Sequence, residues 1–392
     1  MDKSILSAEI QEFITSNINT DISILALQKN KFPASDWTTI LNQIAAKQKV
    51  KSKLPTWFNT SHIYYPSKIS VEQTSSEKTA EYKSRLVSGD KLIDLTGGFG
   101  VDDFYFSKKV NQVTHCEINL ELSDIVAHNF ERLQVKNIEC IAGDSSEILI
   151  VLNQKFDWIY IDPSRRNDAK GKVFMLKDCL PNVPELLDFY FESANNIMIK
   201  TAPILDISAG LSELKNVKTI HIIALENEVK ELLWILEKNY SKSIEIVTCN
   251  LTKDTAEEFI FELGNSLISY YGLPKKYVFE PNAAIMKSGG FDEVTAQFEV
   301  DKLHQHSHLY TSDILIDFPG RAFEIENYFE YNKHNMKSIL ENKKANITTR
   351  NFPETVENIR KKWKITDGGN MYCFFTTAAN NNKIVLLCSK LK

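Results

Sequence analysis

Apolar residues recur at three- and four-residue spacing through the first part of the chain. The segments "SILSAEIQEFITSNI", "DISILALQ" and "SDWTTILNQIAAKQKVKSK" follow this spacing, with polar breaks between them. Such spacing places apolar side chains on one face of a helix. The pattern therefore predicts a small helical domain over residues 1–70. A further helix is expected to begin at Thr74, because Glu77 three residues later completes a capping-box pattern.

From Lys91 to about residue 264 the pattern changes to short apolar runs separated by amphipathic segments. The runs "KLIDLTG", "VTHCEIN", "IECIAGD", "DWIYIDP", "NIMIKTA" and "TIHIIALE" are typical of strands, whereas "NLELSDIVAHNFERL" and "EVKELLWILEK" are typical of helices. This alternation predicts a parallel, doubly wound α/β sheet. The runs "SIEIVTCNL" and "EEFIFEL" have no clear helix between them, so we expect one antiparallel strand at the sheet edge.

Beyond about residue 270 a new strand-helix-strand-strand pattern appears in "ANITTRNF", "PETVENIRKKWK", "NMYCFFTT" and "KIVLLC". Pro353 suits the first turn of the helix, and Gly368 and Gly369 follow its end. We expect a separate C-terminal α+β unit over about 320–392.

Composition and charge narrow the classes of protein to consider. The chain has 392 residues, of which 43% are hydrophobic, and a net charge of −5. A globular protein of two or three domains is expected, with any site for a polyanion confined to a local patch. The six cysteines include no C-x-x-C pair, so we expect reduced thiols in a cytoplasmic protein. No apolar run approaches membrane-spanning length, and the N-terminus lacks a signal-peptide pattern, so no membrane partner is expected.

The stretch "LIDLTGGFGVDD" predicts a strand, a glycine turn and the start of a helix. Glycines let the backbone approach a ligand closely, and the turn amides can face an anionic group. A mononucleotide-like ligand is therefore expected. Asp103 stands where the dinucleotide fingerprint has its third glycine, which disfavours a nicotinamide or flavin dinucleotide. The alternative is a tight turn that only packs a helix on a sheet.

An acidic residue stands at the end of each of the first four expected strands. In a parallel sheet these ends meet at one edge, where ligands bind. Glu117 could accept both hydroxyl protons of a ribose there. Chance is the alternative explanation, because acids are common in turns. The four acids are Asp94, Glu117, Asp144 and Asp162.

Over residues 70–264 this pattern resembles the class I S-adenosylmethionine-dependent methyltransferases. The resemblance implies a mostly parallel, seven-stranded α/β sheet with S-adenosyl-L-methionine as cofactor and no metal. It places the ribose at Glu117, the adenine at Asp144 and the catalytic motif at Asp162. The methionine end of the cofactor is expected on the turn formed by Asp94, Thr96, Gly97, Gly98 and Gly100.

The motifs "DLTGGFGVDDFYFS" and "DPSRR" together resemble a bacterial methyltransferase group that carries a C-terminal THUMP-like domain. The segment "NITTRNFPETVENIRKKWKITDGG" is similar to that domain, and residues 270–315 resemble a small ferredoxin-like domain. THUMP domains proper bind RNA, so the resemblance implies that the substrate is an RNA, either tRNA or rRNA. The domains expected are a helical region 1–70, a methyltransferase core 71–268, a ferredoxin-like domain 269–319 and a THUMP-like domain 320–392.

The acceptor motif that the resemblance implies supports two interpretations. The Asp162 carboxylate and the carbonyl near Pro163 can accept N–H bonds from a nucleobase amine. Amino-directed methyltransferases continue with an aromatic residue, which is missing here unless Phe174 or an arginine plane stacks on the base. The two arginines can bind phosphate or form ion pairs with nearby acids. The catalytic set expected is Asp162, Pro163, Ser164, Arg165 and Arg166.

Other candidate residues carry less weight. Cys179 and Cys249 do not match the motif of methyltransferases that use a cysteine nucleophile. In "LHQHSHLY", His304, His306 and His308 share a face if extended, but no acid or cysteine completes a metal set, so surface histidines are expected.

Basic residues gather in the THUMP-like segment of this acidic protein. They predict contact with an RNA backbone, although a solvated helix face is the alternative. Two other functions stay open: a non-catalytic RNA-binding protein that keeps the fold, and a methyltransferase for a small molecule. The basic residues are Lys343, Lys344, Arg350, Arg360, Lys361, Lys362 and Lys364.

Overall fold

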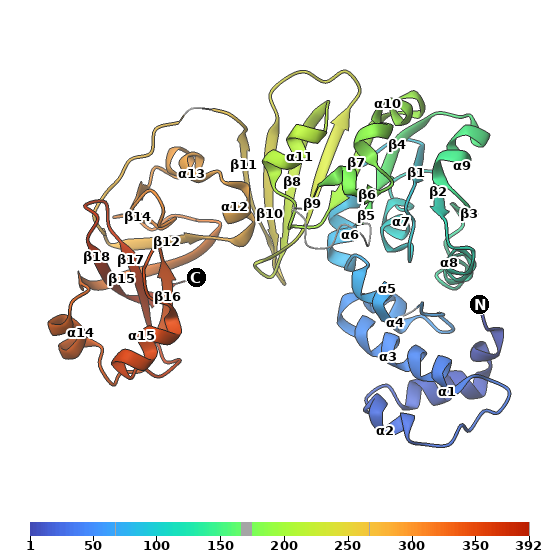
Figure 1. The fold of residues 1–392 in the computed structure, drawn as a ribbon, viewed down its shortest axis with the longest axis horizontal. Helices are drawn as coiled ribbons and strands as arrows, with labels where there is room; N and C mark the ends of the chain where they lie inside the picture. The colour runs from blue at the N-terminus through green and yellow to red at the C-terminus, as the bar shows by residue number, and fades with distance from the viewer. Residues whose placement is uncertain (67, 166–174, 266, 392) are drawn as a thin grey trace. The chain divides into compact units, whose positions relative to one another are not determined.

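The computed structural model describes residues 1–66, 68–165, 175–265 and 267–391 (Figure 1). The chain divides into two compact units. The first consists of Met1–Lys218 and Leu232–Lys242, and the second of Thr219–Glu231 and Ser243–Lys392. Among the described helices, none is long and apolar enough to span a bilayer.

Helices form the start of the first unit, as the apolar spacing predicts. The longest of them is α3, and short segments connect one helix to the next (Figure 1). Their bounds are α1 (Ala8–Ser16), α2 (Ile22–Ala26), α3 (Trp37–Lys53), α4 (Pro55–Asn59), α5 (Lys68–Gln73) and α6 (Glu77–Ser84).

The start expected at Thr74 is wrong, because α6 begins at Glu77 with Ser76 as its N-cap. The Ser76 hydroxyl accepts a hydrogen bond from the backbone N–H of Thr79 at 3.2 Å. The Glu77 carboxylate does not close a capping box. It accepts hydrogen bonds from the backbone N–H of Thr56 at 2.6 Å and from its hydroxyl at 2.8 Å, and so ties α6 to the start of α4.

The large sheet has nine strands in the order β11-β10-β8-β9-β7-β4-β1-β2-β3. This confirms the α/β class, although the sheet has nine strands where the resemblance implies seven. The strands β3, β2, β1, β4 and β7 pair in parallel, and β11 forms the expected antiparallel edge on β10. The bounds are β1 (Lys91–Asp94), β2 (Gln112–Glu117), β3 (Ile138–Ala142), β4 (Phe156–Ile161), β7 (Ala194–Thr201), β8 (Val217–Leu225), β9 (Glu228–Glu237), β10 (Glu245–Leu251) and β11 (Ala256–Glu262).

The helix expected in "EVKELLWILEK" is wrong, because this segment forms β9, antiparallel to β7. Five consecutive apolar residues from Leu232 to Leu236 are buried, and a continuous apolar run of this kind suits a strand covered on both faces. Periodicity alone cannot separate such a run from a buried helix. The two residues between β8 and β9, Glu226 and Asn227, both have positive φ (50° and 63°), as a tight hairpin turn requires.

Helices connect the parallel strands, as the alternation predicts. Of these, α7 follows the glycine turn directly, and α8 confirms the helix expected in "NLELSDIVAHNFERL". A short two-stranded sheet pairs Ser164 with Leu180. The bounds are α7 (Val101–Phe106), α8 (Leu120–Arg132), α9 (Ser145–Leu152), α10 (Val183–Ser193), α11 (Ile207–Glu213), β5 (Ser164–Arg165) and β6 (Cys179–Leu180).

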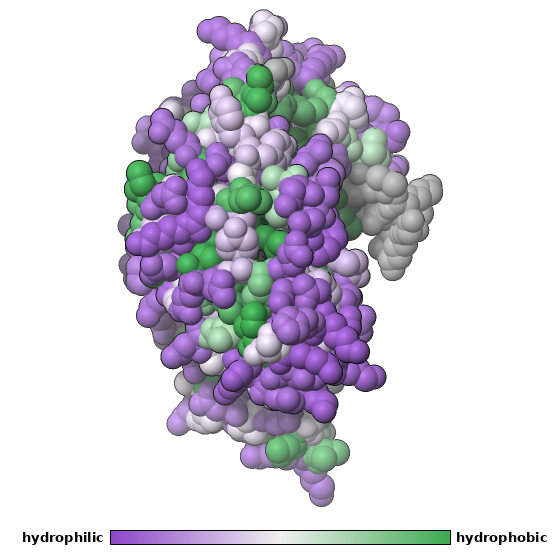
Figure 2. Space-filling view, turned by 90° about the vertical axis from the view of Figure 1, so that its left-hand side faces the viewer, coloured by the Kyte–Doolittle hydropathy of each residue, from purple (hydrophilic) through white to green (hydrophobic). Residues whose placement is uncertain are grey.

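A second sheet of seven strands, in the order β13-β14-β12-β15-β18-β17-β16, forms the C-terminal part. The expected strand-helix-strand-strand pattern is present as β16, α15, β17 and β18. The side seen in Figure 2 is mostly hydrophilic, with smaller hydrophobic areas among the polar residues. The bounds are β12 (Tyr277–Pro281), α12 (Ala283–Ser288), α13 (Phe291–Phe298), β13 (Asp301–Lys302), β14 (Tyr310–Ser312), β15 (Gly320–Glu330), α14 (Lys333–Ile339), β16 (Asn346–Arg350), α15 (Val356–Trp363), β17 (Met371–Thr377) and β18 (Lys383–Lys390).

The expected position of Pro353 in the first turn of α15 is wrong, because the helix begins at Val356 with Thr355 as its N-cap. The end of this helix follows the prediction more closely. Lys364 caps it in the left-handed region, and Gly368 and Gly369 follow with φ of 94° and 83°.

The N-terminal helices pack directly on the helices that follow the glycine turn. The ring of Trp57 lies 4.9 Å from that of Phe104 and 6.3 Å from that of Phe99, measured between centroids. The Asn129 side chain accepts from the backbone N–H of Tyr64 and donates to its carbonyl, both at 2.9 Å. These contacts make the helical region part of the core that supports the turn.

Replacement of Trp57 by alanine should therefore lower the free energy of unfolding by about 3–5 kcal/mol, the usual cost of removing a buried tryptophan. Urea unfolding of the purified protein measures this change. Leu27→Ala is the control, because Leu27 is 90% exposed and should cost little. Equal losses in the two variants would contradict the packing role of Trp57.

Candidate active site

A cavity of about 520 Å³ lies at the carboxyl ends of the parallel strands of the first unit. The order β4-β1-β2 means that the chain leaves β1 toward one neighbour and returns on its other side, a switch point where open α/β sheets form crevices. The four strand-end acids all line this cavity, together with residues of the glycine turn. The structure thus brings together side chains that lie far apart in sequence: Asp94, Glu117, Asp144 and Asp162.

The glycine turn follows β1 without space for side chains beneath it. A Cβ on Gly97 would overlap the imidazole ring of His115. Gly98 and Gly100 have φ of 57° and 72°, which other residues rarely adopt. The turn is tied to β2 by a 2.8 Å hydrogen bond from the Gly97 N–H to the carbonyl of Cys116.

Glu117 is held at the end of β2 by two backbone groups. One carboxylate oxygen accepts from the Gly98 N–H at 3.0 Å, and the other accepts from the Asn119 N–H at 2.8 Å. Each carboxylate oxygen has two lone pairs, so both retain capacity to accept a further hydrogen bond. The geometry suits a pair of neighbouring hydroxyl groups.

Asp144 lies at the end of β3 and caps α9. Its Oδ1 accepts from the backbone N–H groups of Ser146 at 2.9 Å and Glu147 at 3.1 Å. The side chain therefore has a local structural role besides its position at the cavity.

Beneath the turn lies a buried polar chain that the sequence patterns do not reveal. Asp94 accepts from the Thr96 N–H at 2.7 Å, and His115 Nδ1 lies 2.6 Å from Asp103 Oδ2. Burial, with repulsion from the neighbouring carboxylates, raises the pKa of Asp94 and of Asp103 well above the usual range. Burial also lowers the pKa of His115, which favours the neutral imidazole. Asp103 of α7, in the position of the missing third glycine, thus meets His115 of β2 beneath the turn.

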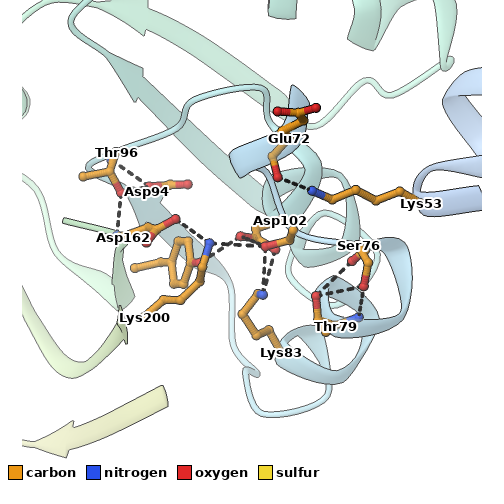
Figure 3. A network of polar contacts seen from close by, with 12 residues as sticks. Lys53, Glu72, Ser76, Thr79, Lys83, Asp94, Thr96, Asp102, Asp162 and Lys200 are labelled. Carbon is orange, nitrogen blue, oxygen red and sulfur yellow. Dashed lines mark hydrogen bonds and ion pairs between the residues drawn. The ribbon is translucent and has the colours of Figure 1, made fainter. Parts of the chain in front are cut away.

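At the other end of the cavity Asp162 forms an ion pair with Lys200, which lies near the end of β7 (Figure 3). The Asp162 backbone N–H also donates to the Thr96 hydroxyl at 2.7 Å, which links the fourth strand to the turn. Sequence reasoning missed Lys200. The available signal was its position at the end of the run "NIMIKTA", next to the strand that ends in Asp162.

Next to this pair, the Asp102 carboxylate accepts hydrogen bonds from several side chains. It lies 3.2 Å from Lys83 Nζ and accepts from the hydroxyls of Tyr160 at 2.8 Å and Ser75 at 2.9 Å. Burial opposes its ionisation, but Lys83 and Lys200 outweigh that effect and lower the pKa of Asp102. The ionised form of Asp102 is therefore favoured.

Of the remaining acceptor residues, Pro163 is buried and Ser164 faces the cavity. The backbone of Arg165 pairs with Cys179 in the short two-stranded sheet. Arg166 and Phe174 lie outside the described residues, as does the side chain of Arg165. Whether these arginines bind phosphate or acids thus remains a prediction.

The cysteines and histidines are placed without a catalytic or metal arrangement in the described part of the chain. The six cysteines form no disulfide in the described part of the chain, and burial raises the pKa of Cys140 and Cys373 to about 12. His304 is hydrogen-bonded to Asn381, whereas His308 stacks on Phe291 with 3.7 Å between the ring centroids. Within the described ranges no three His, Cys, Asp or Glu side chains form a metal-binding group.

The basic residues of the C-terminal part are only partly available for a polyanion. Three of them are paired: Arg350 with Glu280 at 2.7 Å, Lys362 with Glu354 at 3.0 Å, and Arg360 with Asp367. For the other four the described residues give no ion pair, and all are exposed. They are Lys343, Lys344, Lys361 and Lys364.

Comparison with known proteins assigns the family. Residues 277–319 match a family model described as a ferredoxin-like domain, and residues 320–390 match one described as THUMP domain-like. A crystal structure of a "putative methyltransferase" from Porphyromonas gingivalis W83 is 32% identical, with a TM-score of 0.89 over 100% of this chain and 99% of that one. The chain belongs to this family of methyltransferases with a C-terminal THUMP-like domain. No curated protein matches it.

Two other solved structures resemble only part of this methyltransferase. An rRNA methylase from Streptococcus thermophilus is 14% identical, with a TM-score of 0.31 over 41% of this chain and 94% of that chain. An O-methyltransferase from Bacillus cereus is 13% identical, with a TM-score of 0.36 over 50% of this chain and 97% of that chain. These values are too low to support an argument about this methyltransferase.

The buried acids beneath the turn should make stability depend on pH. Because folding raises their pKa, the stabilisation is full below the unfolded pKa and is lost as pH rises through the folded pKa. Asp94→Asn copies the protonated acid, so its free energy of unfolding should fall less steeply with rising pH, by up to about 1.4 kcal/mol per pH unit. Urea unfolding between acid and neutral pH measures the slope.

The control for this comparison is Asp124→Asn, which removes an exposed carboxylate of α8. Its slope should match that of the wild type. If Asp94→Asn had the same slope as the wild type as well, the raised pKa of Asp94 would be contradicted.

Proposed function

We propose that this protein transfers a methyl group from S-adenosyl-L-methionine to a nucleobase of RNA, tRNA or rRNA, in the cytoplasm. The observation that carries the proposal is the cavity that joins the glycine turn to the four strand-end acids. Its volume of about 520 Å³ lies within the range of sites for cofactors and small ligands. Membership of a methyltransferase family supports the reaction class.

The residues at the cavity fit the cofactor. Glu117 has both oxygens fixed by backbone donors and free lone pairs for the two ribose hydroxyls. The absent Cβ of Gly98 leaves the backbone of the turn open to the methionine end, with Thr96 beside it. The absent Cβ of Gly97 lets the turn lie directly on His115. Asp94 and Gly100 shape this turn, and Asp144 is the proposed adenine contact.

S-Adenosyl-L-methionine supplies a methyl group on a positively charged sulfur, which is already activated for displacement. The protein's task is then to hold the acceptor in line, which can contribute roughly 7–11 kcal/mol to lowering the barrier. Asp162 and Ser164 line this end of the cavity. We assign the acceptor to them together with Pro163, Arg165 and Arg166. Leu180 and Pro181 also line it and offer an apolar surface to a flat base.

The RNA part of the proposal rests on the THUMP-like match at residues 320–390. The exposed lysines of that region provide the charge that a phosphate backbone requires. We propose the domain division 1–70, 71–268, 269–319 and 320–392, with the last two docking the RNA.

Calorimetric titration of S-adenosyl-L-methionine tests the cofactor site. Glu117→Ala should weaken binding by about 1 kcal/mol or more, because ribose hydroxyls lose their acceptors. Glu139→Ala is the matched control, since Glu139 is an exposed acid on β3 that does not line the cavity. If the folded wild type, freed of copurified cofactor, shows no binding, the methyltransferase proposal fails and an RNA-binding protein that keeps the fold becomes the better account.

Filter binding of total RNA at several salt concentrations tests the RNA surface. Joint replacement of Lys343, Lys344, Lys361 and Lys364 by alanine should weaken binding and make it less sensitive to salt. On single strands, the slope of log affinity against log salt should become shallower by about 0.7 for each phosphate that no longer meets a lysine. Lys242→Ala with Lys253→Ala removes exposed charge elsewhere and should change neither quantity. Equal binding by both variants would point to a small-molecule substrate.

A further inference from the structure

The ion pair between Lys200 and Asp162 lies where the acceptor must bind. The two residues follow paired positions on neighbouring parallel strands, since Ile161 of β4 pairs with Ile199 of β7. The Asp162 side chain is 38% exposed and that of Lys200 is 12% exposed, and both line the cavity. A ligand atom that meets Asp162 therefore also meets a positive charge.

Lys200 is held in this place from behind. Its Nζ lies 3.4 Å from the hydroxyl of Ser75, which in turn donates to Asp102 at 2.9 Å. Lys83 is fully buried and donates to the same Ser75 oxygen at 3.0 Å. This network holds the ammonium of Lys200 at the acceptor end of the cavity. Figure 3 labels Lys83, Asp102, Asp162 and Lys200.

A fixed ammonium discriminates between kinds of acceptor atom. An exocyclic amine gains positive charge as it attacks a methyl group, and a nearby cation raises the energy of that transition state. A ring N–H beside a carbonyl, the lactam of guanine and uracil, instead loses its proton and leaves an anion shared with the carbonyl oxygen. A nearby cation stabilises that anion.

The acidity of the acceptor group gives the same answer. Proton transfer to a carboxylate is most effective when the acidities of donor and acceptor are close. A lactam N–H is more acidic than either a nucleobase amine or a ribose hydroxyl. The pair is thus suited to the lactam.

Resting on the proposed function, we propose that the methyl acceptor is a lactam ring nitrogen of guanine or uracil, with Asp162 as base and Lys200 as the group that stabilises the anion. Asp162 takes the ring proton and later releases it to water. The electron pair left on nitrogen forms the new N–C bond as the carbon–sulfur bond of the methyl donor breaks, and the electrons of that bond stay on sulfur.

The position of the methyl group tests this directly. Total RNA from cells that lack the protein is incubated with the full chain and isotope-labelled S-adenosyl-L-methionine, digested to nucleosides and analysed by mass spectrometry. Label on the ring nitrogen of guanosine or uridine supports the inference. Label on an exocyclic amine, a carbon or a ribose overturns the inference. Methylation of RNA, the broader part of the proposed function, would still be supported. No label on RNA, with cofactor binding intact, overturns the proposed RNA substrate and this inference with it.

Variants of Lys200 test its role separately. Lys200→Met should lower the rate of methyl transfer by about 100-fold or more. Its rate should recover as pH rises, because more of the lactam is then already ionised in solution and no longer needs Lys200 to stabilise the anion as it forms. Lys200→Arg keeps the cation and should retain more activity. Calorimetric affinity for S-adenosyl-L-methionine should change by less than about threefold in both, which separates this role from a general loss of the site.

Lys215→Met is the matched control, because it breaks the exposed ion pair of Lys215 with Asp188. It should keep both the rate and the pH profile of the wild type. A Lys200→Met enzyme that binds the cofactor normally but shows the wild-type pH profile would overturn the assigned role of Lys200.

Discussion

The parallel pairing of β1 with both β2 and β4 is the constraint on which the site depends. It places the ends of three strands at one edge and leaves a crevice above β1, because the connections run to opposite sides. Asp94, Glu117 and Asp162, at the ends of these three strands, take their positions from this register. Asp94 lies opposite His115 on one side and Tyr160 on the other. The buried support of the turn and the network around Asp102 are thereby built from adjacent strands.

Charge is distributed unevenly around the cavity. The acids beneath the turn are deeply buried and favour their neutral form, whereas Asp102 has two lysines nearby and stays ionised. The turn is thus supported from below by acids whose neutral form is favoured, whereas the ion pair of Asp162 with Lys200 lies at the acceptor end. Such separation keeps the cofactor end suited to hydrogen bonding and the other end suited to proton transfer.

The sequence predicted the elements whose signals are local. Three features were predicted because a short continuous segment is enough to recognise each of them. They are the glycine turn, the strand-end acids and the amphipathic α8. β9 was missed because a run buried on both faces has no periodicity that separates strand from helix. Ser76 was missed as the N-cap because Glu77 serves a distant partner, Thr56, rather than its own helix.

The missed site residues share one cause. Lys83, Lys200 and Ser75 meet only through the fold, since the 3.4 Å approach of Lys200 to Ser75 joins residues 125 positions apart. No spacing rule in the sequence relates them. The acids were predictable because each follows or ends an expected strand. Their partners come from other elements: Lys83 from α6, Ser75 from the loop before it and Lys200 from β7, the fifth parallel strand.

The packing of Trp57 on Phe99 and Phe104 has a thermodynamic consequence. Phe99 belongs to the turn that lines the cavity, so a ligand that requires the folded turn also requires the helices packed against it. When the free ligand concentration is about a hundred times the dissociation constant, such binding adds about 2.7 kcal/mol to the free energy of unfolding of the turn together with these helices. Amide hydrogens in α4 would then exchange more slowly when the cavity is filled, although α4 contributes no residue to its lining. The N-terminal helices therefore share in the binding free energy of a site that α4 does not touch.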